Sequence, residues 1–188
     1  MSVTEVFRRF TAALDQAGIA YMLTGSFASA YYGAPRSTQD IDMVVEASAA
    51  QLRALVESLP KDEYYADLDA ALSACQAESL FNVIELSTGW KIDLIIRKSR
   101  PFSREEFSRR RRVQLQGLSL CVASAEDVVI AKLEWSKLAQ SQRQVEDVAA
   151  ILRLQHKTLD HSYVNKWIRD LGLEREWADA LRRAESSP

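Results

Sequence analysis

The chain contains little cysteine, glycine and proline, and it has no long apolar run. Its two cysteines, Cys75 and Cys121, are too few for a disulfide scaffold. Six glycines and four prolines exclude collagen-like and low-complexity sequence, and no apolar run approaches the ~20 residues that cross a bilayer. The segment MSVTEVFRRF lacks the uninterrupted apolar core of a signal peptide. We therefore expect a soluble, cytoplasmic protein with no membrane partner.

The overall composition is that of an ordinary globular protein. Of the 188 residues, 47% are hydrophobic and 27% are charged, and the formal net charge is -2. A chain of this length buries roughly 70% of the surface that it exposes when unfolded, which is enough for one sizeable core. We expect one domain, or one domain with a helical appendage.

The small net charge conceals a basic stretch between Arg97 and Arg112. This stretch holds eight basic residues against Glu105 and Glu106, a local charge of +6, so the rest of the chain carries -8. A basic stretch on an otherwise acidic protein attracts polyanions such as nucleotide phosphates or an RNA backbone. A solvated helix face is the alternative interpretation.

The pattern of apolar residues changes near Cys121. Before this point helical and strand patterns alternate, and beyond it the sequence predicts helices only. Strands are expected at 19–24, 39–45, 79–86, 90–96, 113–116 and 118–123. Helices are expected up to Gly18 and at 26–32, 48–59, 128–138, 142–155, 161–171 and 174–184. The predicted fold class is α/β (α+β), with a mixed sheet and flanking helices in residues 1–123 and a helical region in residues 124–188.

Two aspartates on the predicted strand 39–45 share one side of it. Because side chains alternate across a strand, Asp40 and Asp42 point to one face while Ile41 and Met43 point to the other. Like charges at this spacing raise the pKa of one another unless a cation lies between them. Mg²⁺ takes carboxylate oxygens and fills its remaining positions with water and substrate phosphates. The alternative is an edge strand with two solvated aspartates.

A third aspartate, Asp93, stands on a later predicted strand. Its neighbours Ile92, Leu94 and Ile95 are apolar, and an unpaired carboxylate among them would be costly. Three carboxylates from two neighbouring strands predict a two-metal site.

A possible phosphate-binding turn precedes these strands. Gly25 lets the backbone approach a ligand closely, and a helix that starts at Ser26 offers unpaired N–H groups to an anion. Arg36 and Thr38 lie just before the carboxylates and could reach the same phosphates. A plain structural turn and a solvent-exposed arginine are the alternatives.

In combination, these residues resemble a known superfamily. Gly25 and Ser26, thirteen intervening residues, Asp40-Ile41-Asp42, and then Asp93 form an ordered set similar to the signature of the DNA polymerase beta-like nucleotidyltransferases. The segment from Arg36 to Asp42 is similar to that of small bacterial members, including the nucleotidyltransferases of AbiE-type toxin-antitoxin systems.

The resemblance implies a role for each matching residue. Gly25 and Ser26 would hold a nucleoside triphosphate such as ATP, and Asp40 and Asp42 would bind Mg²⁺ or Mn²⁺. Asp93 would complete the metal site and act as a base toward the acceptor hydroxyl.

The helical tail adds a weaker likeness. Lys132, followed by Arg143 and Asp147, looks like a tail motif of the same group, although Gln144 stands where an acidic residue is often found. Lys132 is then a candidate phosphate contact, and a surface lysine is the alternative.

The implied activity is transfer of a nucleoside monophosphate from a nucleoside triphosphate to an acceptor hydroxyl, with release of pyrophosphate. The basic stretch favours RNA or a tRNA 3′ end as acceptor, bound through Arg109–Arg112. A protein hydroxyl and a small antibiotic are also compatible. A non-catalytic, antitoxin-like module with a toxin or antitoxin partner is the alternative from a different class.

Overall fold

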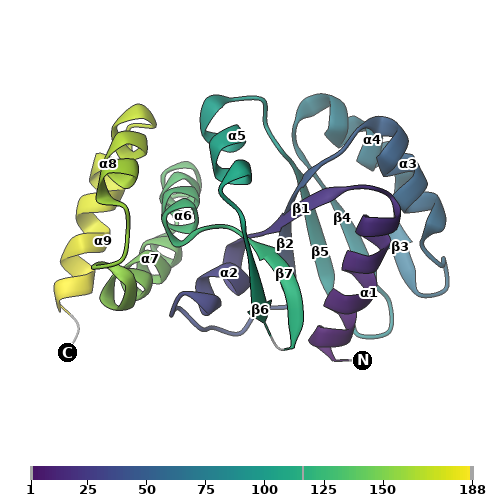
Figure 1. The fold of residues 1–188 in the computed structure, drawn as a ribbon, viewed down its shortest axis with the longest axis horizontal. Coiled ribbons are helices and arrows are strands. Elements are labelled where there is room, and N and C mark those ends of the chain that lie inside the picture. The colour runs from purple at the N-terminus through teal and green to yellow at the C-terminus, as the bar shows by residue number, and fades with distance from the viewer. Residues whose placement is uncertain (1, 116, 187–188) are drawn as a thin grey trace. The chain divides into compact units, whose positions relative to one another are not determined.

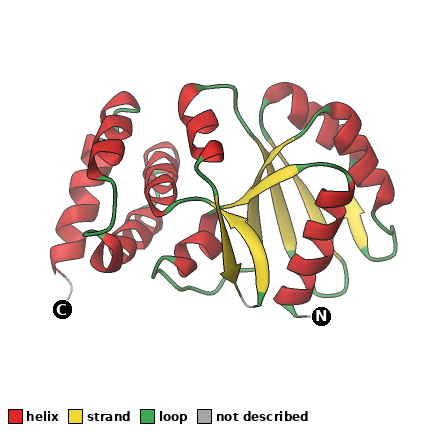
Figure 2. Ribbon diagram, in the orientation of Figure 1, coloured by secondary structure: helices red, strands yellow, loops and turns green. Residues whose placement is uncertain are grey.

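The computed structural model describes residues 2–115 and 117–186 (Figures 1 and 2). Gln116, the last residue of one predicted strand, therefore lies outside the described residues. The strands are β1 (Ala20–Leu23), β2 (Asp40–Glu46), β3 (Tyr64–Ala66), β4 (Leu80–Glu85), β5 (Lys91–Ile96), β6 (Arg111–Leu115) and β7 (Leu118–Val122). The helices are α1 (Val3–Gln16), α2 (Gly25–Tyr31), α3 (Ala49–Ser58), α4 (Leu68–Ala77), α5 (Pro101–Ser108), α6 (Ala125–Ala139), α7 (Gln142–Gln155), α8 (His161–Asp170) and α9 (Glu174–Ser186).

The described strands form one mixed sheet in the order β3-β4-β5-β2-β1-β7-β6. Strands β2 and β5 are parallel, as are β1 and β7, and the other neighbours are antiparallel. The mixed sheet with flanking and C-terminal helices confirms the predicted fold class.

One face of the sheet packs against helices. Ile41 and Met43 of β2 and Leu94 of β5 are buried on this face. Helix α1 lies in front of the strands in Figure 1, and its Phe10 contacts Tyr64 of β3 with 6.3 Å between ring centroids. The apolar alternation of the strands thus directs the core to one side.

Most predicted elements are present, for the expected reasons. Helix α1 buries Val6, Phe10 and Leu14 on one stripe, and Gly18 (φ +66°) follows its end in a conformation that favours glycine. Ser48 begins α3 with a capping box in which the Gln51 side chain accepts from the Ser48 backbone.

Three elements were not predicted. Strand β3 has only three residues, and helix α4 is rich in alanine and begins after Asp67, whose side chain accepts from Ala70 N. Helix α5 occupies the basic stretch, with Phe102 and Phe107 buried. The high charge of this segment obscured the two aromatic positions that make the helix amphipathic.

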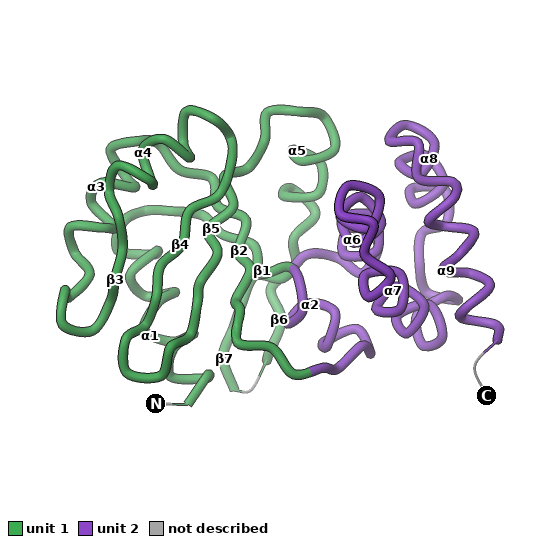
Figure 3. Tube along the Cα trace, turned by 180° about the vertical axis from the view of Figure 1, so that it is seen from behind, with its two compact units in different colours: residues 1–24, 37–122 green, residues 25–36, 123–188 purple. Residues whose placement is uncertain are grey.

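The chain forms two compact units, coloured separately in Figure 3. The first comprises residues 1–24 and 37–122, and the second comprises 25–36 and 123–188. The second unit thus contains α2 together with α6 to α9. The domain boundary between residues 123 and 124 stays a prediction.

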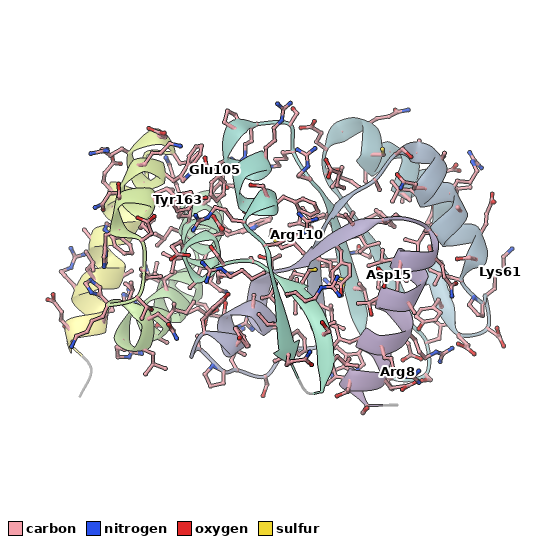
Figure 4. The ribbon with its side chains drawn as sticks, viewed as in Figure 1. Arg8, Asp15, Lys61, Glu105, Arg110 and Tyr163 are labelled. Carbon is pink, nitrogen blue, oxygen red and sulfur yellow. The ribbon has the colours of Figure 1, made fainter. Side chains whose placement is uncertain are left out.

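Within the second unit, a buried carboxylate joins α6 to α8. The Tyr163 hydroxyl, labelled in Figure 4, donates to Asp127 Oδ1 at 2.6 Å, and the Ser124 hydroxyl donates to Oδ2 at 2.6 Å. Asp127 is fully buried, so these hydrogen bonds offset the cost of removing its charge from water.

Candidate active site

Strand β2 presents its two aspartates as the alternation predicts. Ile41 and Met43 are buried on the helix-covered face, whereas Asp40 is exposed and Asp42 is half-buried on the opposite face. We call this opposite face of the sheet the carboxylate face. The interpretation of β2 as an edge strand is wrong, because β5 and β1 flank it.

The third aspartate joins the same face through strand β5. In the parallel register of β2 and β5, Asp93 lies beside Asp42, and Lys91 lies beside Asp40. The prediction that Asp40, Asp42 and Asp93 come from neighbouring strands is therefore confirmed in the arrangement of the backbone.

A lysine that the sequence reasoning missed lies between the carboxylates. Lys91 Nζ is 3.3 Å from Asp40 Oδ1 and 3.2 Å from Asp93 Oδ2. Burial lowers the pKa of Lys91, but the hydrogen bond and charge of Asp93, followed by those of Asp40, outweigh it and raise this pKa. The alternation of Lys91 and Asp93 in the sequence KIDL was the available signal.

A second missed residue positions Asp93. Asn82 of β4 lies beside Asp93 in the antiparallel register, and its Nδ2 donates to Asp93 Oδ1 at 2.5 Å. Asn82 is the polar residue between Phe81 and Val83, so its place on the carboxylate face could have been read from the same alternation.

The carboxylate face suits a divalent metal by its chemistry. Over residues 2–115 and 117–186, no group of three His, Cys, Asp or Glu side chains is arranged to hold a metal ion. The oxygens of Asp40, Asp42 and Asp93 are nonetheless hard ligands of the type that Mg²⁺ prefers. The Lys91 ammonium lies within 3.3 Å of both Asp40 and Asp93 and neutralises part of their charge.

Thr38 supports the start of β2. Its hydroxyl accepts from Asp40 N at 3.2 Å and donates to Asp40 O at 3.3 Å. These bonds fix the backbone that carries the first aspartate. Whether Thr38 also contacts a nucleotide stays a prediction.

Gly25 and Ser26 occupy the first turn of α2. The helix begins at Gly25 (φ +60°), one residue earlier than predicted, so Ser26 lies within the helix instead of capping it. The Ser29 hydroxyl donates to Gly25 O at 2.7 Å. The assignment of Gly25 and Ser26 to a triphosphate therefore rests on the sequence motif.

Arg36 and Lys132, both predicted to bind nucleotide, meet at one carboxylate in the second unit. Lys132 Nζ donates to Asp147 Oδ2 at 2.7 Å, and Arg36 Nε donates to the same oxygen at 3.2 Å. Lys132 Nζ also donates to Gln144 Oε1 at 2.9 Å. Lys132 is buried, so its interpretation as a surface lysine is wrong.

The basic stretch runs from the end of β5 through α5 into β6, with Arg104 on the helix and Arg111 and Arg112 on the strand. Arg110, labelled in Figure 4, stacks over the Phe107 ring at 4.2 Å and donates to Phe107 O at 2.6 Å. Arg111 and Arg112 are exposed on β6, at the edge of the described sheet. The interpretation of the stretch as one helix face is therefore wrong. Arg111 and Arg112 are better placed than Arg110 to bind an external polyanion.

A separate groove of about 810 Å³ lies in the second unit, between α6, α7 and α9. It contains none of the predicted site residues. Two of its arginines are engaged locally: Arg182 and Arg183 pair with Asp179, and Arg183 also pairs with Glu146. We assign it no part in the candidate site.

Comparison with solved structures identifies the fold. A crystal structure of an antigenic nucleotidyltransferase-like protein from Paracoccidioides brasiliensis matches with a TM-score of 0.56 and 15% sequence identity, covering 93% of this chain and 90% of that one. The solution structure of the antibiotic-resistance factor ANT(2'')-Ia matches with a TM-score of 0.54 and 14% identity, covering 98% of each chain. The chain therefore has a nucleotidyltransferase-like fold.

Comparisons of the sequence give no match. No protein-family model matches the chain, and no curated protein matches it. Among the helices of residues 2–115 and 117–186, none is long and apolar enough to span a membrane.

Proposed function

We propose that this protein is a nucleotidyltransferase, which moves a nucleoside monophosphate from a nucleoside triphosphate to an acceptor hydroxyl. The observation that carries the proposal is the register of β2 and β5, which aligns Asp42 with Asp93 and places Asp40 on the same face. Three carboxylates on an accessible face of a sheet with this fold suit metal-assisted phosphoryl chemistry.

The metal ligands in this proposal are Asp40, Asp42 and Asp93. When bound, Mg²⁺ or Mn²⁺ would neutralise charge on the α-phosphate and on the leaving pyrophosphate. The side chain of Lys91 has the length and flexibility to release Asp40 and Asp93 when another cation binds.

Asp93 accepts the proton of the acceptor hydroxyl. The hydroxyl oxygen then forms the new bond to the α-phosphorus, and the bond from phosphorus to the bridging oxygen breaks to release pyrophosphate. Asn82 keeps Asp93 in place through its hydrogen bond, so Asn82 is a positioning residue.

The nucleotide contacts are assigned to the residues that the sequence signature marks. Gly25 and Ser26 bind the triphosphate, with ATP as the favoured nucleotide, and Arg36, Thr38 and Lys132 add phosphate contacts. To make these contacts, Arg36 and Lys132 have to leave their ion pairs with Asp147.

The acceptor is assigned to RNA, including a tRNA 3′ end. The exposed Arg111 and Arg112 support this choice, because paired cations at a sheet edge attract a phosphate backbone. The proposal places the enzyme in the cytoplasm and includes the AbiE-type toxin-antitoxin likeness, with a cognate toxin or antitoxin as partner.

A second candidate function is modification of a small antibiotic. The match to the antibiotic-resistance factor ANT(2'')-Ia favours this candidate. The protein would then transfer the same nucleotide to a hydroxyl of a small molecule.

One assay tests these assignments. The protein is incubated with each α-labelled nucleoside triphosphate, Mg²⁺ or Mn²⁺, and total RNA, cell lysate or a panel of hydroxyl-bearing antibiotics, and pyrophosphate release and label transfer are scored. We expect transfer to RNA with ATP. Transfer only to an antibiotic would establish the second candidate, and no transfer with any acceptor would favour a non-catalytic interaction module.

A further inference from the structure

The carboxylate face is covered at one side and open at the other. Val44 of β2 and Met22 of β1 share this face and are buried. Toward the opposite edge, the exposed fractions rise to 42% for Leu80 on β4 and 56% for Tyr65 on β3. Figure 3 shows these strands from the side that α1 does not cover. Within the first unit, a large molecule can therefore approach the carboxylates across β4 and β3.

Tyr65 stands in one row with the site residues. The register aligns Tyr65 with Ile84, Ile84 with Lys91, and Lys91 with Asp40. The neighbouring Tyr64 points to the helix-covered face and is buried, which fixes Tyr65 on the carboxylate face by alternation.

The spacing between Tyr65 and Asp93 suits a single nucleoside. Strands β3 and β5 are two strand spacings apart, and Asp93 lies two residues beyond Lys91, the residue in register with Tyr65, so the two Cα atoms are about 12 Å apart. A ring that stacks on the Tyr65 side chain can therefore carry a ribose whose hydroxyl reaches Asp93. Leu80 and the half-buried Ile84 provide apolar surface along this path.

The net charge of the carboxylate face favours the nucleobase of the acceptor over its phosphates. Before a metal binds, Asp40, Asp42 and Asp93 outnumber Lys91 on this face, so the face offers a phosphate backbone no net attraction. A neutral nucleobase would not be repelled, and aromatic side chains stack on all bases.

We propose that Tyr65 is the stacking platform for the terminal nucleoside of the acceptor and places its hydroxyl at Asp93. This inference rests on the proposed nucleotidyltransferase function. It identifies the edge of the sheet by which the acceptor enters, opposite to the arginines on β6.

The test compares Tyr65→Ala, Tyr65→Phe and a control, Leu138→Ala, which removes another exposed apolar side chain, from α6 in the second unit. The acceptor probe is a single-stranded RNA oligonucleotide with a free 3′ hydroxyl. We expect Tyr65→Ala to raise the KM for this RNA about ten-fold or more. Tyr65→Phe and Leu138→Ala should keep the wild-type KM, and the calorimetric affinity for ATP should be unchanged in all three.

The outcomes separate this inference from the function on which it depends. If Asp42→Asn abolishes transfer but Tyr65→Ala keeps the wild-type KM for RNA, the stacking role is overturned and the function stands. If a hydroxyl-bearing antibiotic is modified and the RNA is not, the nucleoside assignment is overturned. If Asp42→Asn transfers normally, the proposed function itself fails.

Discussion

Each unit contains a cluster in which a lysine pairs with carboxylates, and the two clusters differ in their exposure to solvent. On the carboxylate face, 41% of the Lys91 side chain and 52% of the Asp40 side chain are exposed. In the second unit, only 4% of the Lys132 side chain and 9% of the Asp147 side chain are exposed. Exposed ion pairs contribute little to folding stability, whereas breaking a buried pair is costly. The comparison indicates that the second cluster contributes more to folding stability than the first.

The largest expected effect is on activity, from Asp42→Asn. This change removes a metal ligand and also relieves repulsion between Asp42 and Asp93, which lie side by side. We expect loss of nucleotidyl transfer with an unchanged or higher melting temperature in metal-free buffer. Label transfer and thermal unfolding measure the two effects. Wild-type turnover in this variant would refute the metal assignment.

The next effect is on stability, from Lys132→Ala. The change leaves the buried Asp147 carboxylate with Arg36 as its remaining ion-pair partner in the structure, at 3.2 Å. We expect the free energy of unfolding to fall by about 3 kcal/mol. The matched control, Lys91→Ala, should change it by less than about 1 kcal/mol. Denaturant titration of both variants provides the test, and equal losses would contradict the contrast between the clusters.

A smaller effect concerns Glu85, a buried carboxylate on the helix-covered face of the sheet. Burial raises its pKa, but hydrogen bonds from the side chains and backbone of Ser87 and Thr88 outweigh it and lower the pKa to about 2. Because the folded pKa is lower than the unfolded value, this stabilisation is present above about pH 4.5 and is lost as the pH falls toward 2.

Glu85→Gln tests this dependence. We expect the variant to be about 2 kcal/mol less stable at neutral pH, because it loses hydrogen bonds to a charged group. Its stability should also vary less than that of the wild type between pH 5 and 2. Urea unfolding at several pH values measures both, and parallel pH curves would show that Glu85 is not the titrating group.

The sequence predicted more of the carboxylate face than of its surroundings. The alternation of side chains along a strand is enough to place Asp40 and Asp42 on the same face. The apolar neighbours of Asp93 indicate a carboxylate in a position where an unpaired charge is costly. Alternation cannot tell which strand lies beside β2, so the contact of Lys91 with Asp40 required the β2–β5 register. The fold class followed from the order of strand and helix patterns.

The buried cluster was harder to predict because its members are distant in sequence. Arg36 and Asp147 are 111 positions apart, and nothing in the local pattern of either residue indicates the other. Helix α5 was not predicted because the charged residues in and around it made its two buried phenylalanines difficult to recognise as an amphipathic pattern.

The smallest expected effect is on the salt dependence of RNA binding. Arg110 is held against Phe107, whereas Arg111 and Arg112 are exposed on β6, so the double change Arg111→Gln and Arg112→Gln should remove the phosphate contacts. We expect the slope of log affinity against log salt to become shallower by about 1.4, since each of the two contacts to a single strand contributes about 0.7. The control is Arg53→Gln on α3, which removes another exposed arginine, paired with Glu57, and should leave the slope unchanged. Anisotropy titrations of labelled single-stranded RNA from about 50 to 200 mM salt measure the slopes. Superimposable lines for the wild type and the double variant would show that the arginines of β6 are a solvated surface, and that RNA, if it is the acceptor, is held elsewhere.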